Sequence, residues 1–264
     1  PAPLVAADPV LARAMGDALI ELGRFGEALT WLESAAAGFA AAGDDARQCH
    51  VVSRLAYALY TEALDWRRMM LVVDRLKPLI PHADALPLAK RIDVYTVLIF
   101  FARTGEFSPE QVTGIARTLG QLTEAAAQAG DARLQVTASA AMLRFLASVD
   151  RYDYTGPFLE LENLLDRTEV SPLSRISWMG IAGYLHCRRA TDMARGNAIL
   201  ARAVQLGEEY GLEQSGPFLL LMFDVVEGLS YAPDIGAFAD SLERLRRCIL
   251  PASLSNWAYY QYFL

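Results

Sequence analysis

Gly23-Arg24-Phe25 is a three-residue turn with a helix-like pattern on either side, and similar turns return along the chain. The bulky last residues of successive turns lie 41, 41, 45, 41 and 42 residues apart. Periods of roughly 40 residues built from two helices are typical of helical solenoids. The later turns are Leu64-Asp65-Trp66, Thr104-Gly105-Glu106-Phe107, Asp150-Arg151-Tyr152, Thr191-Asp192-Met193 and Pro233-Asp234-Ile235. We therefore predict an all-α protein, with structural roles for the turn residues Phe25, Trp66, Phe107, Tyr152, Met193 and Ile235 and burial of the first four.

The expected architecture is a right-handed superhelical solenoid of about six antiparallel helix pairs, followed by a truncated last helix. Residues 1–264 would form one helical-repeat domain, because each repeat of a solenoid contacts only its neighbours. The predicted repeats are 8–43, 45–84, 88–130, 132–169, 171–211 and 215–250, with a partial repeat at 252–264. The chain stops short of the next expected turn, so we expect it to be part of a longer protein.

Helix ends and faces can be predicted around several of these turns. Asp8-Pro9 is a helix start, and Ser108 to Gln111 and Ser171-Pro172 have the same cap-plus-proline character. The Gly43 and Gly130 junctions, each preceded by Ala and followed by Asp, are predicted helix ends. Two apolar stripes are expected to meet across the first turn, one formed by Leu11, Met15, Ala18 and Leu22 and the other by Ala28, Leu32, Ala35 and Phe39.

Composition limits the classes of function. Of the 264 residues, 53% are apolar, but no apolar run approaches the roughly 18 residues of a membrane span. The net charge is −7 and no block of five basic residues occurs, which argues against nucleic-acid binding by this segment. Cys49, Cys187 and Cys248 are scattered and odd in number, which favours reduced thiols and a cytoplasmic location.

Residues around the first turn match the spacing of the tetratricopeptide pattern. They are Gly16, Gly23, Phe25, Glu27, Ala28, Leu32 and Ala35, and Gly196, Leu200 and Ala203 repeat part of it after Asp192-Met193. With a period near 41 and Ala-Gly-Asp junctions, the chain resembles the superhelical sensor domain of MalT-type, LuxR-like, ATP-dependent bacterial transcriptional regulators. The resemblance implies a regulatory domain that binds a small-molecule inducer or a protein in its concave groove. In that family, nucleotide-binding and helix-turn-helix domains lie on either side, and they could mediate homo-oligomerisation.

Two other functions remain open on the sequence. One is a free-standing scaffold for protein–protein interaction, and the other is a helical-toroid enzyme. The sequence has no GxxxxGK[ST], GxSxG or HExxH motif, so we predict no catalysis and no cofactor. Cys49-His50 and His186-Cys187 lack the spacing of zinc ligands, and we predict no metal site there.

Ligand contacts are expected on the first helix of each pair, which usually lines the concave surface of a solenoid. The candidates are Tyr57, Tyr95, Arg144, Trp178 and Tyr184. Aromatic rings stack on sugars or hold peptides, and an arginine supplies fixed donors for a carboxylate or phosphate. Packing between repeats is the alternative role for the aromatic residues. Arg144 is the preferred anchor, because an arginine within an apolar run needs a partner or an open groove.

Overall fold

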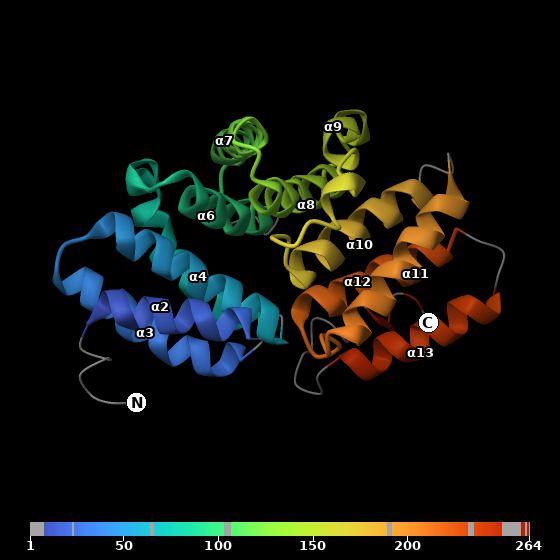
Figure 1. The fold of residues 1–264 in the computed structure, drawn as a ribbon, viewed down its shortest axis with the longest axis horizontal. Coiled ribbons are helices and arrows are strands. Elements are labelled where there is room, and N and C mark those ends of the chain that lie inside the picture. Colours follow the sequence, from blue (N-terminus) through green and yellow to red (C-terminus); the bar gives the residue numbers. More distant parts are fainter. Residues whose placement is uncertain are drawn as a thin grey trace. The chain divides into compact units, whose positions relative to one another are not determined.

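The computed structural model describes residues 8–22, 24–63, 66–102, 107–188, 192–231, 235–249, 260, 261 and 263. Throughout this part of the chain, regular structure is helical and no strand occurs, which confirms the all-α prediction. None of the helices formed by these residues has both the length and the apolar character needed to cross a membrane. The chain divides into two compact units, residues 1–118 and 119–264, which we describe separately (Figure 1).

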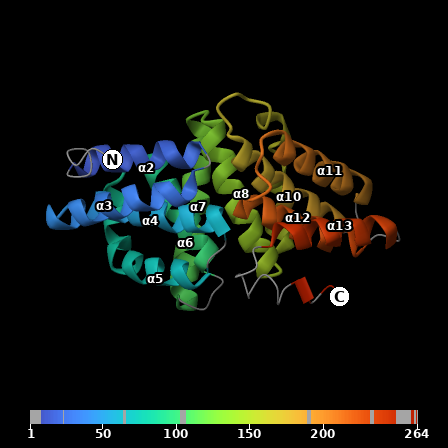
Figure 2. The same cartoon turned by 90° about the horizontal axis from the view of Figure 1, so that it is seen from below.

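The first unit is built around α4. Helices α2 (Pro9–Glu21), α3 (Phe25–Ala41) and α4 (Asp45–Ala63) pack side by side, as both views show (Figures 1 and 2). Helix α5 (Trp66–Leu76) and the 3₁₀ segment η1 (Lys77–Ala85) pack on α4, as does α6 (Leu88–Phe101). The alternate helices α2, α4 and α6 are therefore in contact as a series, with α4 in the middle.

The second unit repeats this arrangement around α10. Helix α7 (Pro109–Gln128) contains the boundary between the units, and α8 (Ala132–Ser148) follows it. Helix α10 (Pro172–Arg188) packs against α8, α11 (Met193–Glu209) and α12 (Gly216–Leu229), and α12 also contacts α13 (Ile235–Cys248). Here α8, α10 and α12 form the series of alternate helices.

Most of the expected helix ends are confirmed. The Asp8 carboxylate accepts hydrogen bonds from the backbone N–H groups of Val10 and Leu11 at 2.8 and 3.3 Å. Ser108 and Gln111 form the reciprocal capping box, with N···O distances of 2.8 and 3.3 Å. The Ser171 hydroxyl accepts from the Ser174 N–H at 3.2 Å. Gly43 and Gly130 follow their helices with φ of 67° and 69°, a left-handed conformation that glycine adopts without strain.

The prediction of which face of α2 is buried is wrong. Leu11, Met15 and Leu22 are 49%, 41% and 70% exposed, and the buried side of the helix consists of Ala12, Gly16, Leu19 and Ile20. Close approach decides between the two faces, because a Cβ added to Gly16 would lie 2.6 Å from Leu32 of α3. The facing stripe of α3, formed by Ala28, Leu32, Ala35 and Phe39, is buried as predicted.

The turn residues do not share one environment. Phe107 is buried, as predicted, whereas Phe25 and Tyr152 are only half-buried and the burial prediction is wrong for them. Met193 is half-buried, and Ile235 is 82% exposed at the start of α13. The side chain of Trp66 and the turn residues Gly23, Leu64, Asp65, Thr104, Gly105, Glu106, Thr191, Pro233 and Asp234 lie outside the described part, as does most of the expected partial repeat.

The fourth expected repeat differs from the others in its second half. Where a second long helix would follow α8, the chain forms the short segments η2 (Tyr152–Tyr154), α9 (Gly156–Leu159) and η3 (Glu162–Leu164). Leu161, Leu165 and Val170 are nevertheless buried, so this irregular stretch still supplies apolar contacts. Pro157 lies within the stretch, near the start of α9, and Pro172 begins the next helix; proline limits the continuation of a helix before it.

Candidate functional site

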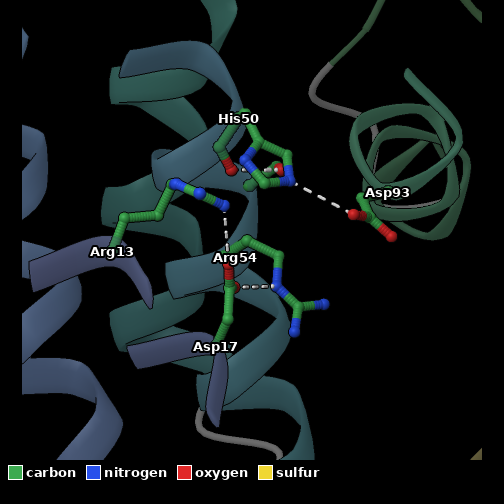
Figure 3. Close-up of polar contacts among 6 residues, drawn as sticks. Arg13, Asp17, His50, Arg54 and Asp93 are labelled. Carbon is green, nitrogen blue, oxygen red and sulfur yellow. Dashed lines mark hydrogen bonds and ion pairs between the residues drawn. The ribbon is translucent and has the colours of Figure 1, made fainter. Parts of the chain in front are cut away.

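Charged side chains connect the three alternate helices of the first unit. We call Arg13, Asp17, His50, Arg54, Lys90 and Asp93 the unit-1 charged cluster; Figure 3 shows all of them except Lys90. Helix α4 contributes His50 and Arg54 from successive turns. The Arg54 Nε donates to Asp17 Oδ1 of α2 at 2.9 Å, and His50 Nε2 lies 3.1 Å from Asp93 Oδ2 of α6. Each flanking helix thus provides a carboxylate to the central one.

Asp17 also accepts a hydrogen bond from a second cation, which lies on its own helix. The Arg13 Nη1 donates to Asp17 Oδ2 at 2.9 Å, so that one carboxylate joins two guanidinium groups. The side chain of Arg54 is only 12% exposed, and that of His50 only 4%. Burial opposes the charge of Arg54, but Asp93, Asp17 and Tyr57 outweigh this effect and raise the pKa of the guanidinium. Arg54 is therefore a permanent buried cation.

The second unit has its own buried ion pair. Arg144 of α8 donates from Nη1 and Nη2 to the two carboxylate oxygens of Asp224 of α12, at 3.1 and 2.6 Å. The two side chains are 12% and 9% exposed. The pair passes Gly180 of α10, where an added Cβ would lie 2.7 Å from Asp224 Oδ2. Glycine at this position gives the two charged side chains room to meet over the central helix.

A second group of polar residues lies on α10 and α12 and just after the end of α8. Arg188 of α10 donates to the hydroxyl of the buried Tyr184 at 2.5 Å, and it also reaches Asp150 at 3.3 Å. Burial raises the pKa of Tyr184. Burial and the neighbouring Asp224 raise the pKa of Glu227 on α12, whereas Tyr184, Arg188 and Arg144 lower it. Glu227 therefore lies within electrostatic reach of both Arg144 and Tyr184.

The five predicted ligand residues have different environments. Arg144 and Tyr184 belong to the same polar region of the second unit. Tyr57 is half-buried and lies under Arg54, whose guanidinium carbon is 5.1 Å from the ring centroid. Tyr95 and Trp178 are buried, at 7% and 0% exposure, and the Trp178 Nε1 donates to the backbone oxygen of Phe158. Their surroundings match the alternative role of packing between helices.

Arg144 has the partner that its apolar surroundings require. Both terminal nitrogens of its guanidinium are hydrogen-bonded to Asp224, so the fork that would hold a ligand carboxylate is occupied within the protein. Its role as a ligand anchor stays a prediction, and a ligand would have to compete with Asp224 for it.

Sequence analysis missed the partners of these residues. Asp224 lies within the run Leu221-Met222-Phe223-Asp224-Val225-Val226, which is as apolar as the run around Arg144. The two residues are 80 positions apart, close to two repeat periods. A search for opposite charges within apolar runs, two periods apart, would have paired them. Arg54 lies in a similar run with Leu55 and Ala56, but its partner Asp17 is 37 positions away, about one repeat period.

The three cysteine thiols are poorly ionised. Cys49 and Cys187 are buried and Cys248 is half-buried, and all three are free. Burial raises the pKa of Cys49 to about 12 and that of Cys248 to about 11. Cys187 Sγ donates to Asn197 Oδ1 at 3.4 Å. Within the described residues, no three His, Cys, Asp or Glu side chains are grouped so that they could hold a metal ion.

Comparison with known proteins does not assign the chain to a family. No protein-family model matches it, and no curated protein matches it. The arrangement described above suits non-covalent binding, because charged groups from three helices lie on adjacent turns with little exposure to water.

Proposed function

We propose that this chain is the regulatory ligand- or protein-binding domain of a MalT-like bacterial transcriptional regulator. The nucleotide-binding and DNA-binding domains of that regulator would lie outside this segment. In this proposal the helix pairs form a right-handed superhelical solenoid, and the alternate helices line its concave face. The turn spacing and the tetratricopeptide-like residues support it, together with the helix pairs found in both units.

The observation that carries the proposal is the placement of charge on the alternate helices. In the first unit, α2, α4 and α6 share the unit-1 charged cluster, and in the second unit α8, α10 and α12 share the polar groups around the Arg144–Asp224 pair. Charged groups with little exposure are costly unless they are paired or used. Lining one series of helices with them in both units is the pattern expected of a binding surface.

A bound ligand could transmit a signal through the repeat interfaces. Each interface in a solenoid contributes a small rotation, so a ligand that prefers one curvature shifts the population toward it. The shift is limited by the difference in affinity between the two states. Neighbouring domains of the regulator would respond to the change.

The test combines the open reading frame with DNA binding. The gene should encode a phosphate loop before this segment and a helix-turn-helix domain after it. The isolated 264-residue chain should bind duplex DNA no better than background at physiological salt, because its net charge is −7, whereas the full-length protein should bind specifically. Absence of both neighbouring domains would refute the proposal, and so would salt-sensitive submicromolar DNA binding by the isolated chain.

One observation favours a free-standing interaction scaffold as the second candidate. The exposed side of α2 carries Val10, Leu11, Met15 and Leu22, all between 41% and 70% exposed. A row of large apolar side chains on one face is typical of a protein contact. If the open reading frame carries neither neighbouring domain, the scaffold becomes the better explanation of the fold.

A further inference from the structure

Arg54 has hydrogen-bond donors that the described part of the protein does not use. A guanidinium has five N–H donors, and that of Arg54 donates only through Nε, to Asp17. Among the described residues, neither terminal nitrogen has a hydrogen-bond partner. In Figure 3 both point away from Asp17. The Tyr57 ring covers one face of the guanidinium, whose carbon lies 5.1 Å from the ring centroid. The Arg54 side chain is only 12% exposed, but neither terminal nitrogen is among the fully buried polar atoms that lack a partner, so both can be reached by solvent or by a small ligand.

Lys90 is a second cation of the same cluster that lies near the two carboxylates without forming an ion pair among the described residues. It is half-buried on α6, one turn before Asp93, and it forms no ion pair with any residue that the structure describes. Burial lowers the pKa of its ammonium group, and Arg13 and Arg47 lower it further, while Asp17 and Asp93 act in the opposite direction. Lys90 and Arg54 are therefore electrostatic neighbours of the same two carboxylates.

The cluster as a whole has an excess of positive charge. Among the described residues of the cluster, the three cations Arg13, Arg54 and Lys90 lie near two carboxylates, Asp17 and Asp93, in a chain whose net charge is −7. Both carboxylates already have partners, since Asp17 accepts from two arginines and Asp93 lies 3.1 Å from His50. A group that could neutralise the remaining cations is absent from the described surroundings.

We propose that the unit-1 charged cluster binds a small anion, with the terminal nitrogens of Arg54 and the ammonium group of Lys90 as its donors. The ligand would present a phosphate or a carboxylate group, since both accept hydrogen bonds from an arginine fork and attract an ammonium group. A metal cation would be repelled, and a neutral sugar would leave the excess charge in place. The inference deepens the proposed function by naming the chemistry of the inducer, and it rests on that function only for the regulatory consequence.

The chain offers a direct measurement, because Lys77 and Lys90 are its only lysines. Reductive methylation with ¹³C-formaldehyde keeps the charge of both side chains and gives each its own NMR signal, which Lys77→Arg would assign. We expect millimolar sodium phosphate or sodium acetate to shift the Lys90 signal in a saturable way and to leave that of Lys77 in place. The pKa of Lys90 should rise on binding, since a nearby anion favours the charged form. The salt that binds more tightly identifies the ligand group as a phosphate or a carboxylate. Sodium chloride at equal ionic strength should neither shift the Lys90 signal in a saturable way nor raise the pKa of Lys90.

Variants connect the signal to the proposed donors. Lys90→Gln and Arg54→Gln should each weaken anion affinity, measured by calorimetry, by at least about tenfold, which corresponds to ~1.4 kcal/mol. Lys90→Gln removes no ion pair seen in the structure, so it should leave the melting temperature near that of the wild type. The matched control is Arg75→Gln, because Arg75 pairs with Glu33 at 2.9 and 3.0 Å on an exposed surface of the same unit. That variant should bind the anion like the wild type.

Two results would overturn the anion site. One is the absence of a Lys90 shift up to 50 mM of either salt, a concentration of roughly fifty times a millimolar dissociation constant. The other is a parallel shift of both lysines that follows ionic strength alone, which would indicate screening. Either result leaves the proposed regulatory function standing, because that function is tested separately by the open reading frame and by DNA binding of the full-length protein.

Discussion

Removing Arg144 should be one of the most damaging single changes in the second unit. In Arg144→Met, the Asp224 carboxylate keeps its 9% exposure but loses two charge-assisted hydrogen bonds of 3.1 and 2.6 Å. It also remains near the like charge of Glu227. Each such bond contributes about 1.5–3 kcal/mol, and leaving a buried charge without its partner typically costs about 3–5 kcal/mol. We expect a loss of unfolding free energy in that range.

Urea unfolding followed by circular dichroism measures this loss, through the midpoint and the slope of the transition. The matched control is Arg202→Met, because Arg202 pairs with Asp166 at the same 2.6 Å in the same unit, but with both side chains more than half exposed. That change should cost less than about 1 kcal/mol. The double variant Arg144→Met/Asp224→Leu should recover most of the loss, because it leaves no unpaired charge. Equal costs for the two arginines would refute the argument that burial decides the result.

Three further predictions concern other positions. Gly180→Ala should destabilise the protein by about 1–3 kcal/mol in thermal or urea unfolding, since its Cβ would lie 2.7 Å from a carboxylate oxygen of the buried pair. As a control, the Cβ added by Gly114→Ala meets nothing within 4 Å, so this change should stabilise α7 by about 0.5–1 kcal/mol. Folding raises the pKa of Glu227, so the protonated Glu227 carboxyl contributes fully to stability below its ordinary pKa of about 4.3, and this contribution is lost as pH rises through the folded pKa. Melting temperatures measured from pH 4 to 8 should therefore fall less in Glu227→Gln than in the wild type. Phe107→Ala should lower the unfolding free energy by about 3–5 kcal/mol, because the side chain is buried. Ile235→Ala, at a side chain that is 82% exposed, should change it by no more than about 0.5 kcal/mol. An unchanged urea midpoint for Phe107→Ala would contradict its buried role.

Local signals predicted much of the fold because they act within a few residues. The Asp8, Ser108 and Ser171 caps and the Gly43 and Gly130 helix ends depend on backbone groups one turn away, which the sequence shows directly. The inner face of α2 was missed because that helix is apolar on more than one side. Its buried side is decided by how closely Gly16 can approach α3, which is a property of the packed pair.

The candidate site was less predictable, because its residues meet across helices. Arg144 stands out within its apolar run, but its partner Asp224 is 80 positions away, and nothing near Arg144 in the sequence points to it. The importance of Arg54 depends on which of its donors remain unused, and only the folded positions of Asp17 and Tyr57 show this. Trp178 donates its N–H group to the Phe158 backbone oxygen inside the core, which matches the packing role, and a ligand role for the aromatic residues stays a prediction.

The buried thiols make the chain convenient for site-specific labelling. Burial raises the pKa of all three thiols, to about 12 for Cys49 and about 11 for Cys248, so little thiolate is present at pH 7. Maleimides and peroxides react with the thiolate, so both should modify the native cysteines slowly. A cysteine introduced on an exposed helix face would then take a fluorophore or spin label selectively, without replacement of the native residues. Changes in the spacing between helices could be followed in this way as a ligand is added.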